Sequence, residues 1–157
     1  MITSKEPFSI DIVLRHPSRS PESIAEALSL KPKGAYSVGQ NLGTLPAKWT
    51  FFHACLQEAR DPSDYESALA KVGQFLEKNA AFWADFIAGN GEAELVLNHA
   101  LEPPEEEGDK ILEMYLGPAF LRALSAQGVG LRVQGWQGTV KTREFAVPST
   151  RANKGCP

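Results

Sequence analysis

The sequence predicts an α+β domain, in which an antiparallel or mixed β-sheet has helices packed mainly on one face; a ferredoxin-like sheet is one candidate topology. Segments in which apolar and polar residues alternate, as in strands, take turns with segments whose apolar residues recur every three or four positions, as in helices. Two of the strand-like segments alternate cleanly, which favours a sheet with one solvated face. The length of 157 residues suits one domain with one hydrophobic core.

The first strand and the first helix are clear in the sequence. The first strand is predicted over Phe8–His16, where every second position from Phe8 to Leu14 is apolar, so one face of this strand is expected on the core. Asp11 is expected on the solvated face, where a carboxylate needs no partner. Ser20 is a good N-cap for the helix that follows, and Pro21 suits its first position. Pro32 stops this helix, because it disfavours helical angles at the preceding residue.

A long Gly-rich loop, Lys31–Ala47, then leads to a strand over Lys48–Cys55. Loops of this length are generally either functional or mobile. Trp49, Phe51 and His53 share one face of the strand, and aromatic residues also occupy the other face. We therefore expect this strand to lie at the centre of the sheet or to be covered by the loop on its second side.

The segment that begins at Asp61-Pro62 predicts a helix, since its apolar residues continue one stripe as far as Ile87. A break near Asn79 is an alternative to one continuous helix. Gly89-Asn90-Gly91 ends the helix in the manner of a left-handed C-cap, and Glu92–His99 is the next strand.

The last third of the chain contains a further helix and a final strand. An acidic loop, Glu102–Asp109, precedes a short strand predicted over Ile111–Leu116. Gly117-Pro118 starts the helix, Gly128 caps it, and the last strand covers Val129–Trp136. We divide the chain into a single α+β domain, residues 1–138, and a basic C-terminal tail, residues 139–157, which is expected to be partly mobile.

Composition argues against several classes of protein. The net charge of −3 does not suit a nucleic-acid-binding protein, and no apolar run is long enough to span a bilayer. The N-terminal segment lacks the apolar stretch of a secretory signal. Two cysteines, Cys55 and Cys156, do not make a disulfide framework, so both are expected to be free thiols in a reducing cytoplasm.

Several of these segments together match the pattern of a known family. They are Phe8–Ile12, Ser20–Leu28, Leu30–Pro32, Gly39, Trp49, and Leu121–Gly128 with Leu131. Over roughly Phe8–Trp136 the chain resembles the bacterial domain of unknown function 4279. The resemblance supports the α+β fold and brings no assigned activity. The acidic segment Glu102–Asp109 and the basic tail depart from the family pattern.

The Gly-rich loop is the best candidate for a binding site. Its glycines permit turns, and an ordered long loop often forms a recognition surface. Tyr36, Gln40 and Trp49 would be its useful contacts, because they offer rigid area and hydrogen bonds. A small-molecule site under the loop would use Trp49 as its floor and Lys33 or His53 as its polar anchor.

Recognised catalytic and metal-binding patterns are missing, and we predict no catalytic residue, metal or cofactor. His53 and Cys55 lie two residues apart on a strand, but no orienting carboxylate stands at a recognised spacing, so they are interpreted as a half-buried histidine and an inert thiol. His16 and His99 each end a strand without a zinc signature. The chain has no P-loop and no Gly-x-Ser-x-Gly motif, and its run of glutamates is interpreted as solvated.

Two hypotheses on function follow. The first is a non-enzymatic protein-binding domain, with an immunity-like or accessory role in a bacterium, that docks another protein through its solvated sheet face or its Gly-rich loop. The alternative is a small-molecule-binding or enzymatic site under Lys31–Ala47. We expect a cytoplasmic monomer or weak homodimer with no specific nucleic acid and no membrane as partner.

Overall fold

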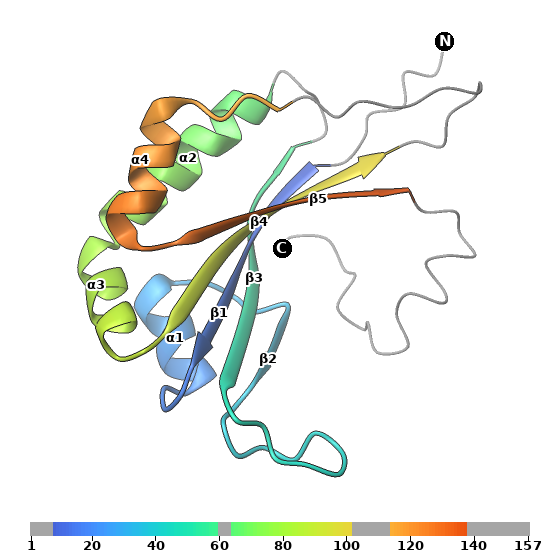
Figure 1. Ribbon diagram of the computed structural model, residues 1–157, viewed down its shortest axis with the longest axis vertical. Helices are drawn as coiled ribbons and strands as arrows, with labels where there is room; N and C mark the ends of the chain where they lie inside the picture. The colour runs from blue at the N-terminus through green and yellow to red at the C-terminus, as the bar shows by residue number, and fades with distance from the viewer. Residues whose placement is uncertain (1–7, 60–63, 102–113, 138–157) are drawn as a thin grey trace.

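The computed structural model describes residues 8–59, 64–101 and 114–137. In this part of the chain a mixed five-stranded sheet carries the described helices on one side, as the sequence predicts (Figure 1). The strands are β1 (Phe8–His16), β2 (Gly34–Tyr36), β3 (Thr50–Ala59), β4 (Glu92–Leu101) and β5 (Gly130–Gln137). The helices are α1 (Pro21–Leu28), α2 (Tyr65–Lys78), α3 (Ala80–Ala88) and α4 (Pro118–Gln127).

The strand order in the sheet is β2-β3-β1-β4-β5. The central strand β1 pairs antiparallel with both β3 and β4, β2 pairs antiparallel with β3, and β5 runs parallel to β4. From β1 to β4 the chain follows the β-α-β-β-α-β order of ferredoxin-like folds, with α2 and α3 together in the place of the second helix. The α4–β5 unit extends the sheet beyond β4.

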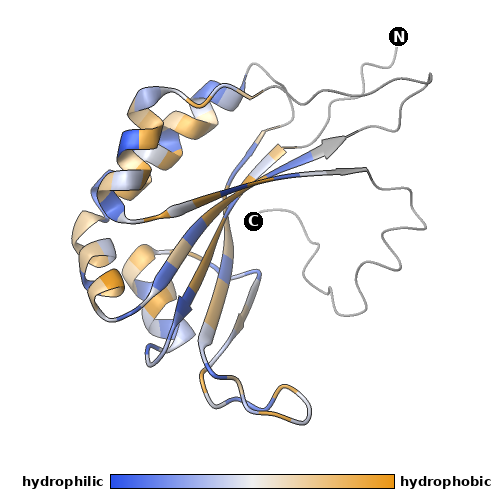
Figure 2. Ribbon diagram, in the orientation of Figure 1, coloured by the Kyte–Doolittle hydropathy of each residue, from blue (hydrophilic) through white to orange (hydrophobic). Residues whose placement is uncertain are grey.

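The core lies between the sheet and the helices. Every second side chain of β1 is buried there, and the apolar stripe of α2 packs against the same face. Trp83 of α3 is fully buried, and its Nε1 donates a hydrogen bond to the carbonyl oxygen of Leu76, 3.1 Å away. Figure 2 shows hydrophobic and hydrophilic residues alternating along the strands. In the described part of the chain, no helix covers the opposite face of the sheet (Figure 1). We call it the open face.

The predicted helix ends are largely confirmed. Ser20 caps α1, since its Oγ accepts a hydrogen bond from the backbone N–H of Ser23 at 3.2 Å. The stripe beyond Asp61 divides at Asn79, where α2 ends and α3 begins, so the alternative with a break is correct. The left-handed residue after α3 is Asn90, with φ 63°.

The Lys31–Ala47 segment is not one open loop. It contains the short strand β2, which the sequence did not reveal, and then a projecting hairpin that we call the arm, residues Ser37–Trp49 (Figure 1). The short strand predicted over Ile111–Leu116 is not formed at its last three residues, and its first three lie outside the described residues. The acidic loop and the predicted tail also lie outside them.

Cys55 differs from its prediction. It lies on β3 and is disulfide-bonded, so the expected free thiol is wrong for this residue. Cys156 lies outside the described residues.

Candidate functional site

The arm is an ordered hairpin that continues the β2–β3 pair. The backbone N–H of Gly39 donates to the carbonyl of Ala47 at 2.7 Å, and the N–H of Ala47 donates to the carbonyl of Gln40 at 2.8 Å. Nearer the tip, the N–H of Leu42 donates to the carbonyl of Leu45 at 3.2 Å. These bonds hold the two sides of the arm together, so its shape does not depend on burial in a core.

Side chains and two glycines fix the base and turns of the arm. The N–H of Val38 donates to Oγ1 of Thr50, a fully buried residue at the start of β3, over 3.0 Å. Oε1 of Gln40 accepts a hydrogen bond from the N–H of Ser37 at 3.1 Å. Gly39 and Gly43 have φ of +81° and +113°, which L side chains rarely adopt.

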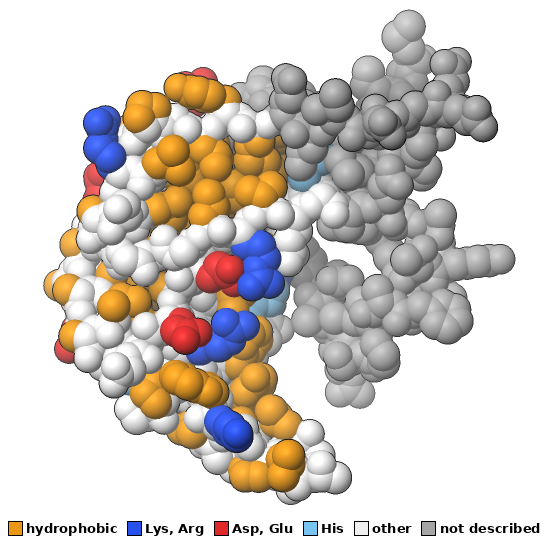
Figure 3. All heavy atoms as spheres, in the orientation of Figure 1, with side chains coloured by type: hydrophobic (Ala, Val, Ile, Leu, Met, Phe, Trp, Pro, Cys, Tyr) orange, Lys and Arg blue, Asp and Glu red, His pale blue; other side chains and the backbone are white. Residues whose placement is uncertain are grey.

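The arm exposes large apolar side chains to solvent. Leu45 is 73% exposed, Leu42 is 51% exposed and Trp49 is 40% exposed, and Val38 is exposed as well. Figure 3 shows hydrophobic side chains along this projection. An apolar surface on a backbone already ordered by hydrogen bonds is typical of a binding element, because little conformational entropy is lost when a partner covers it.

A second candidate site lies on the open face, around Asp11 of β1. Its Oδ2 is 2.7 Å from Nε2 of His53 on β3 and 3.9 Å from Nζ of Lys33, which directly precedes β2. Three adjacent segments of the sheet therefore each contribute one polar side chain. Lys33 is placed by its own backbone, whose N–H donates to the carbonyl of His53 at 2.7 Å.

Asp11 is buried, contrary to the expectation that it would be solvated. The residue is 5% exposed, and its Oδ1 is buried without a hydrogen-bond partner among the described residues. The register between β1 and β3 shifts at Ile10/Asp11, so that a bulge marks this position in the central strand. A buried carboxylate oxygen without a donor is unfavourable, and a donor group of a ligand or an ordered water would satisfy it.

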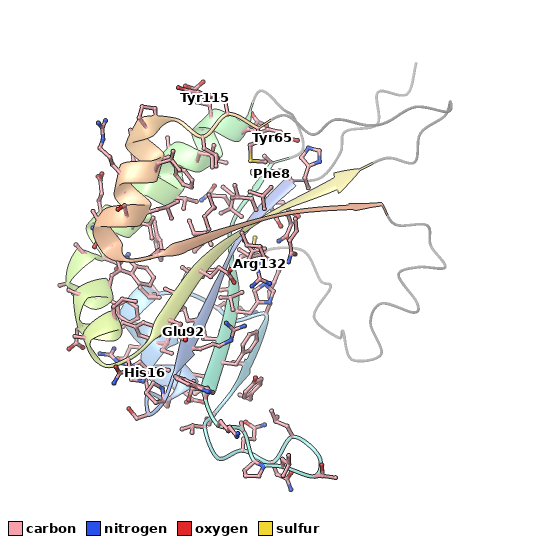
Figure 4. All side chains as sticks on the ribbon, viewed as in Figure 1. Phe8, His16, Tyr65, Glu92, Tyr115 and Arg132 are labelled. Carbon is pink, nitrogen blue, oxygen red and sulfur yellow. The ribbon has the colours of Figure 1, made fainter. Side chains whose placement is uncertain are left out.

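Elsewhere on the open face, the described residues include charge pairs and a stacked aromatic pair. Arg132 of β5 contacts Glu94 of β4 at 3.0 Å, and Arg15 lies 3.8 Å from Glu92. Figure 4 labels Arg132 and Glu92, and Figure 3 shows acidic and basic side chains in contact on the visible face. Tyr36 stacks on Phe51 beside the Asp11 cluster, with ring centroids 5.2 Å apart.

His16 and His99 lie at opposite ends of β1 and do not meet. His99 is the β4 neighbour of Phe8, whereas His16 lies eight residues further along β1, about 26 Å away at the usual rise of a strand. Figure 4 shows Phe8 and His16 at these two ends. His99 contacts the hydroxyl of Tyr65 at 2.9 Å. Within the described ranges no group of three or more histidine, cysteine or acidic residues could hold a metal ion.

The structure divides the predicted binding residues between the two candidate sites. Lys33 and His53 meet around Asp11, and Tyr36 stacks next to them. Gln40 and Trp49 belong to the arm, where Trp49 is 40% exposed. Sequence reasoning missed Asp11; its signal was an aspartate in the middle of a central strand, where this residue type is rare.

Comparisons with known proteins do not add to this picture. No family model, curated protein or solved structure matches the chain. The resemblance to the domain of unknown function 4279 therefore stays a prediction. In the described part of the chain, no helix is long and apolar enough to cross a membrane.

Proposed function

We propose that this chain is a non-enzymatic protein-binding domain that docks a partner protein through its arm. The observation that supports this proposal is the combination of internal backbone hydrogen bonds with leucines exposed at 73% and 51%. Preorganised loops that present a few large apolar anchors are effective binding elements, because a handful of anchors supplies most of the binding energy.

An accessory or immunity-like role in a bacterium fits such a domain. The cytoplasmic localisation stays a proposal to which cysteine usage lends no support, because the disulfide at Cys55 is typical of an oxidising environment. The proposed partner is another protein, with no specific nucleic acid, and the domain itself is proposed to be a monomer or weak homodimer.

The first experiment identifies the partner and then removes the anchors. A photo-reactive amino acid at position 45 captures the partner in the organism that encodes the chain, and the captured protein is purified for binding measurements. The double variant Leu42→Asp/Leu45→Asp is expected to weaken binding more than about 100-fold, because two hot-spot side chains become charged. Its free energy of unfolding is expected to change by less than about 0.5 kcal/mol, since both leucines are exposed.

Tyr115→Asp is the matched control. Tyr115 is 83% exposed and lies far from the arm, at the other end of the molecule (Figure 4). This variant is expected to bind normally. The proposal is wrong if position 45 captures nothing that position 115 does not capture, or if both variants weaken binding equally.

A second candidate function is a small-molecule site at the Asp11 cluster. It is favoured by the buried Oδ1 of Asp11, which an N–H or O–H donor of a ligand would satisfy. Oδ2 of Asp11 already contacts Nζ of Lys33 and Nε2 of His53. The ring of Tyr36, stacked on Phe51, offers an aromatic surface next to them.

Thermal unfolding with a panel of small metabolites tests this candidate. A ligand at about 100 times its Kd is expected to stabilise the wild type by about 2.7 kcal/mol. The same ligand is expected to stabilise Lys71→Met, a control on an exposed lysine of α2, but not Lys33→Met. A panel without a hit, or a hit that stabilises both variants equally, contradicts a ligand site here.

A further inference from the structure

Among the described residues, the outer edge of β5 is unpaired, and it is the longer of the two edges of the sheet. β5 is the last strand in the order and has eight residues, whereas β2, at the opposite edge, has three. No other strand among the described residues pairs with the outer side of β5. A free edge of this length presents a row of N–H and C=O groups that another strand can pair with.

Three features that often protect such an edge, proline, lysine and a bulge, are absent from β5 itself. Its sequence contains no proline and no lysine, and its register with β4 is continuous, without a bulge. Its one charged residue, Arg132, is turned to the neighbouring strand, where Nε and Nη2 contact the carboxylate of Glu94 at 3.1 and 3.0 Å. The edge therefore carries no unpaired charge that would repel an approaching strand.

An exposed apolar surface adjoins this edge on the helix side. Val133 of β5 is 47% exposed and Leu121 of α4 is 44% exposed. Figure 3 shows hydrophobic side chains gathered in the region between α4 and β5. A strand that pairs with β5 would bring apolar surface of its own chain over these side chains, adding burial to the backbone hydrogen bonds.

We propose that β5 pairs antiparallel with β5 of a second copy of this chain, which forms a two-fold symmetric dimer with one continuous sheet. A second copy fits because identical edges related by a two-fold axis offer each other the same donors, acceptors and apolar residues. The internal pairing of Arg132 with Glu94 also lets two copies meet without repulsion between like charges. The contact is small, so the expected Kd is on the order of micromolar. This proposal does not depend on the arm.

Analytical ultracentrifugation of the full chain over about 1–200 µM is the direct test. The wild type, with a chain mass of 17.1 kDa, is expected to change from monomer to dimer with concentration. Val133→Lys is expected to raise the dimer Kd at least about tenfold, because a lysine on an edge strand opposes pairing. Leu121→Lys is expected to act in the same direction, and it tests the contact without changing the strand. Leu45→Lys, which places the same charge on the arm, is expected to leave the Kd unchanged.

Hydrogen exchange locates the interface. The amides of residues 130–137 are expected to become more protected as the concentration rises, and those of the arm are not. A wild type that stays monomeric throughout the range overturns the proposal. The proposal is also overturned if Leu45→Lys disrupts the dimer and Val133→Lys does not, because the arm would then form the interface. Full protection of residues 130–137 in the monomer also overturns it, because the edge would then be covered by the same chain.

Discussion

His16 is the residue whose chemistry the structure defines most completely. It is buried at the end of β1, and its Nδ1 accepts hydrogen bonds from the backbone N–H groups of Ser18 at 3.1 Å and Arg19 at 3.0 Å. An acceptor nitrogen carries no proton, so the ring that holds this turn is neutral. Burial, and then the nearby Arg19 guanidinium, lower the pKa of His16 from its ordinary value of 6.5, although Asp85 opposes the shift.

The lowered pKa predicts that the fold loses stability in mild acid. The unfolded chain binds a proton at His16 near pH 6.5 and the folded chain binds it only at lower pH, so protonation favours unfolding. The contribution of His16 is complete above about pH 6.5 and declines as the pH falls below it toward the folded pKa. Denaturant unfolding from about pH 7.5 to about pH 5 measures this decline.

His16→Asn is the control for this prediction. Asparagine keeps an oxygen that can accept the same backbone N–H groups, but it does not titrate. Its free energy of unfolding is expected to be lower than that of the wild type at neutral pH, because the ring contact with Phe86 is lost. The difference between the two proteins is expected to shrink in acid, and a difference that stays constant with pH contradicts the assignment.

At the same scale, the candidate site could be predicted only in part. Lys33 and His53 could be singled out because they are polar residues in the Gly-rich loop and in the strand that follows it. The burial of Asp11 could not be predicted, because alternation assigns a residue to a face of the sheet but does not tell whether that face is covered. The distance between Asp11 and His53 depends on the pairing of β1 with β3, which no local pattern encodes.

At the scale of elements, the helices and long strands follow from periodicity and capping. β2 could not be predicted, because three residues are too few to show an alternation. The arm could not be predicted either, because its pairing is made by backbone groups, which every residue type carries. The break at Asn79 could be anticipated, since a polar residue interrupts an otherwise apolar stripe. Asn79 completes the break by bonding its Nδ2 to the carbonyl of Phe75 at 2.8 Å.

Substitution by alanine is expected to change the free energy of unfolding in opposite directions at two glycines, one inside α2 and one after α3. Gly73 lies inside α2 with no atom within 4 Å of an added Cβ, so Gly73→Ala is expected to stabilise the fold by about 0.5–1 kcal/mol through helix propensity. Gly91 follows α3, and a Cβ there would lie 2.4 Å from the ring of the fully buried Phe86. Gly91→Ala is therefore expected to destabilise by about 2–3 kcal/mol.

Urea unfolding of both variants beside the wild type measures these effects. Equal m-values would show that the changes act on the folded state and not on the compactness of the unfolded chain. A destabilised Gly73→Ala, or a Gly91→Ala variant as stable as the wild type, would contradict the packing described for these positions.

For the whole molecule, the fold class could be predicted but the strand order could not. Composition and periodicity are properties of neighbouring residues, whereas the order β2-β3-β1-β4-β5 is decided by contacts between distant segments. The parallel pairing of β4 with β5 is an example, because the alternation of apolar and polar residues in a strand does not depend on the direction of its neighbour. The open face likewise holds paired side chains whose partners are far apart in sequence, such as Arg132 and Glu94.

The chain enters and leaves the arm at neighbouring points, since the N–H of Gly39 bonds to the carbonyl of Ala47. The pairing of β2 with β3 therefore requires only that the two ends of the arm stay together. It does not depend on the number or type of the residues that join them. Insertions, deletions and substitutions between Gly39 and Ala47 are therefore expected to leave the folding of the rest of the domain intact. The surface proposed to bind a partner can therefore be changed in sequence and length without changing the sheet that carries it.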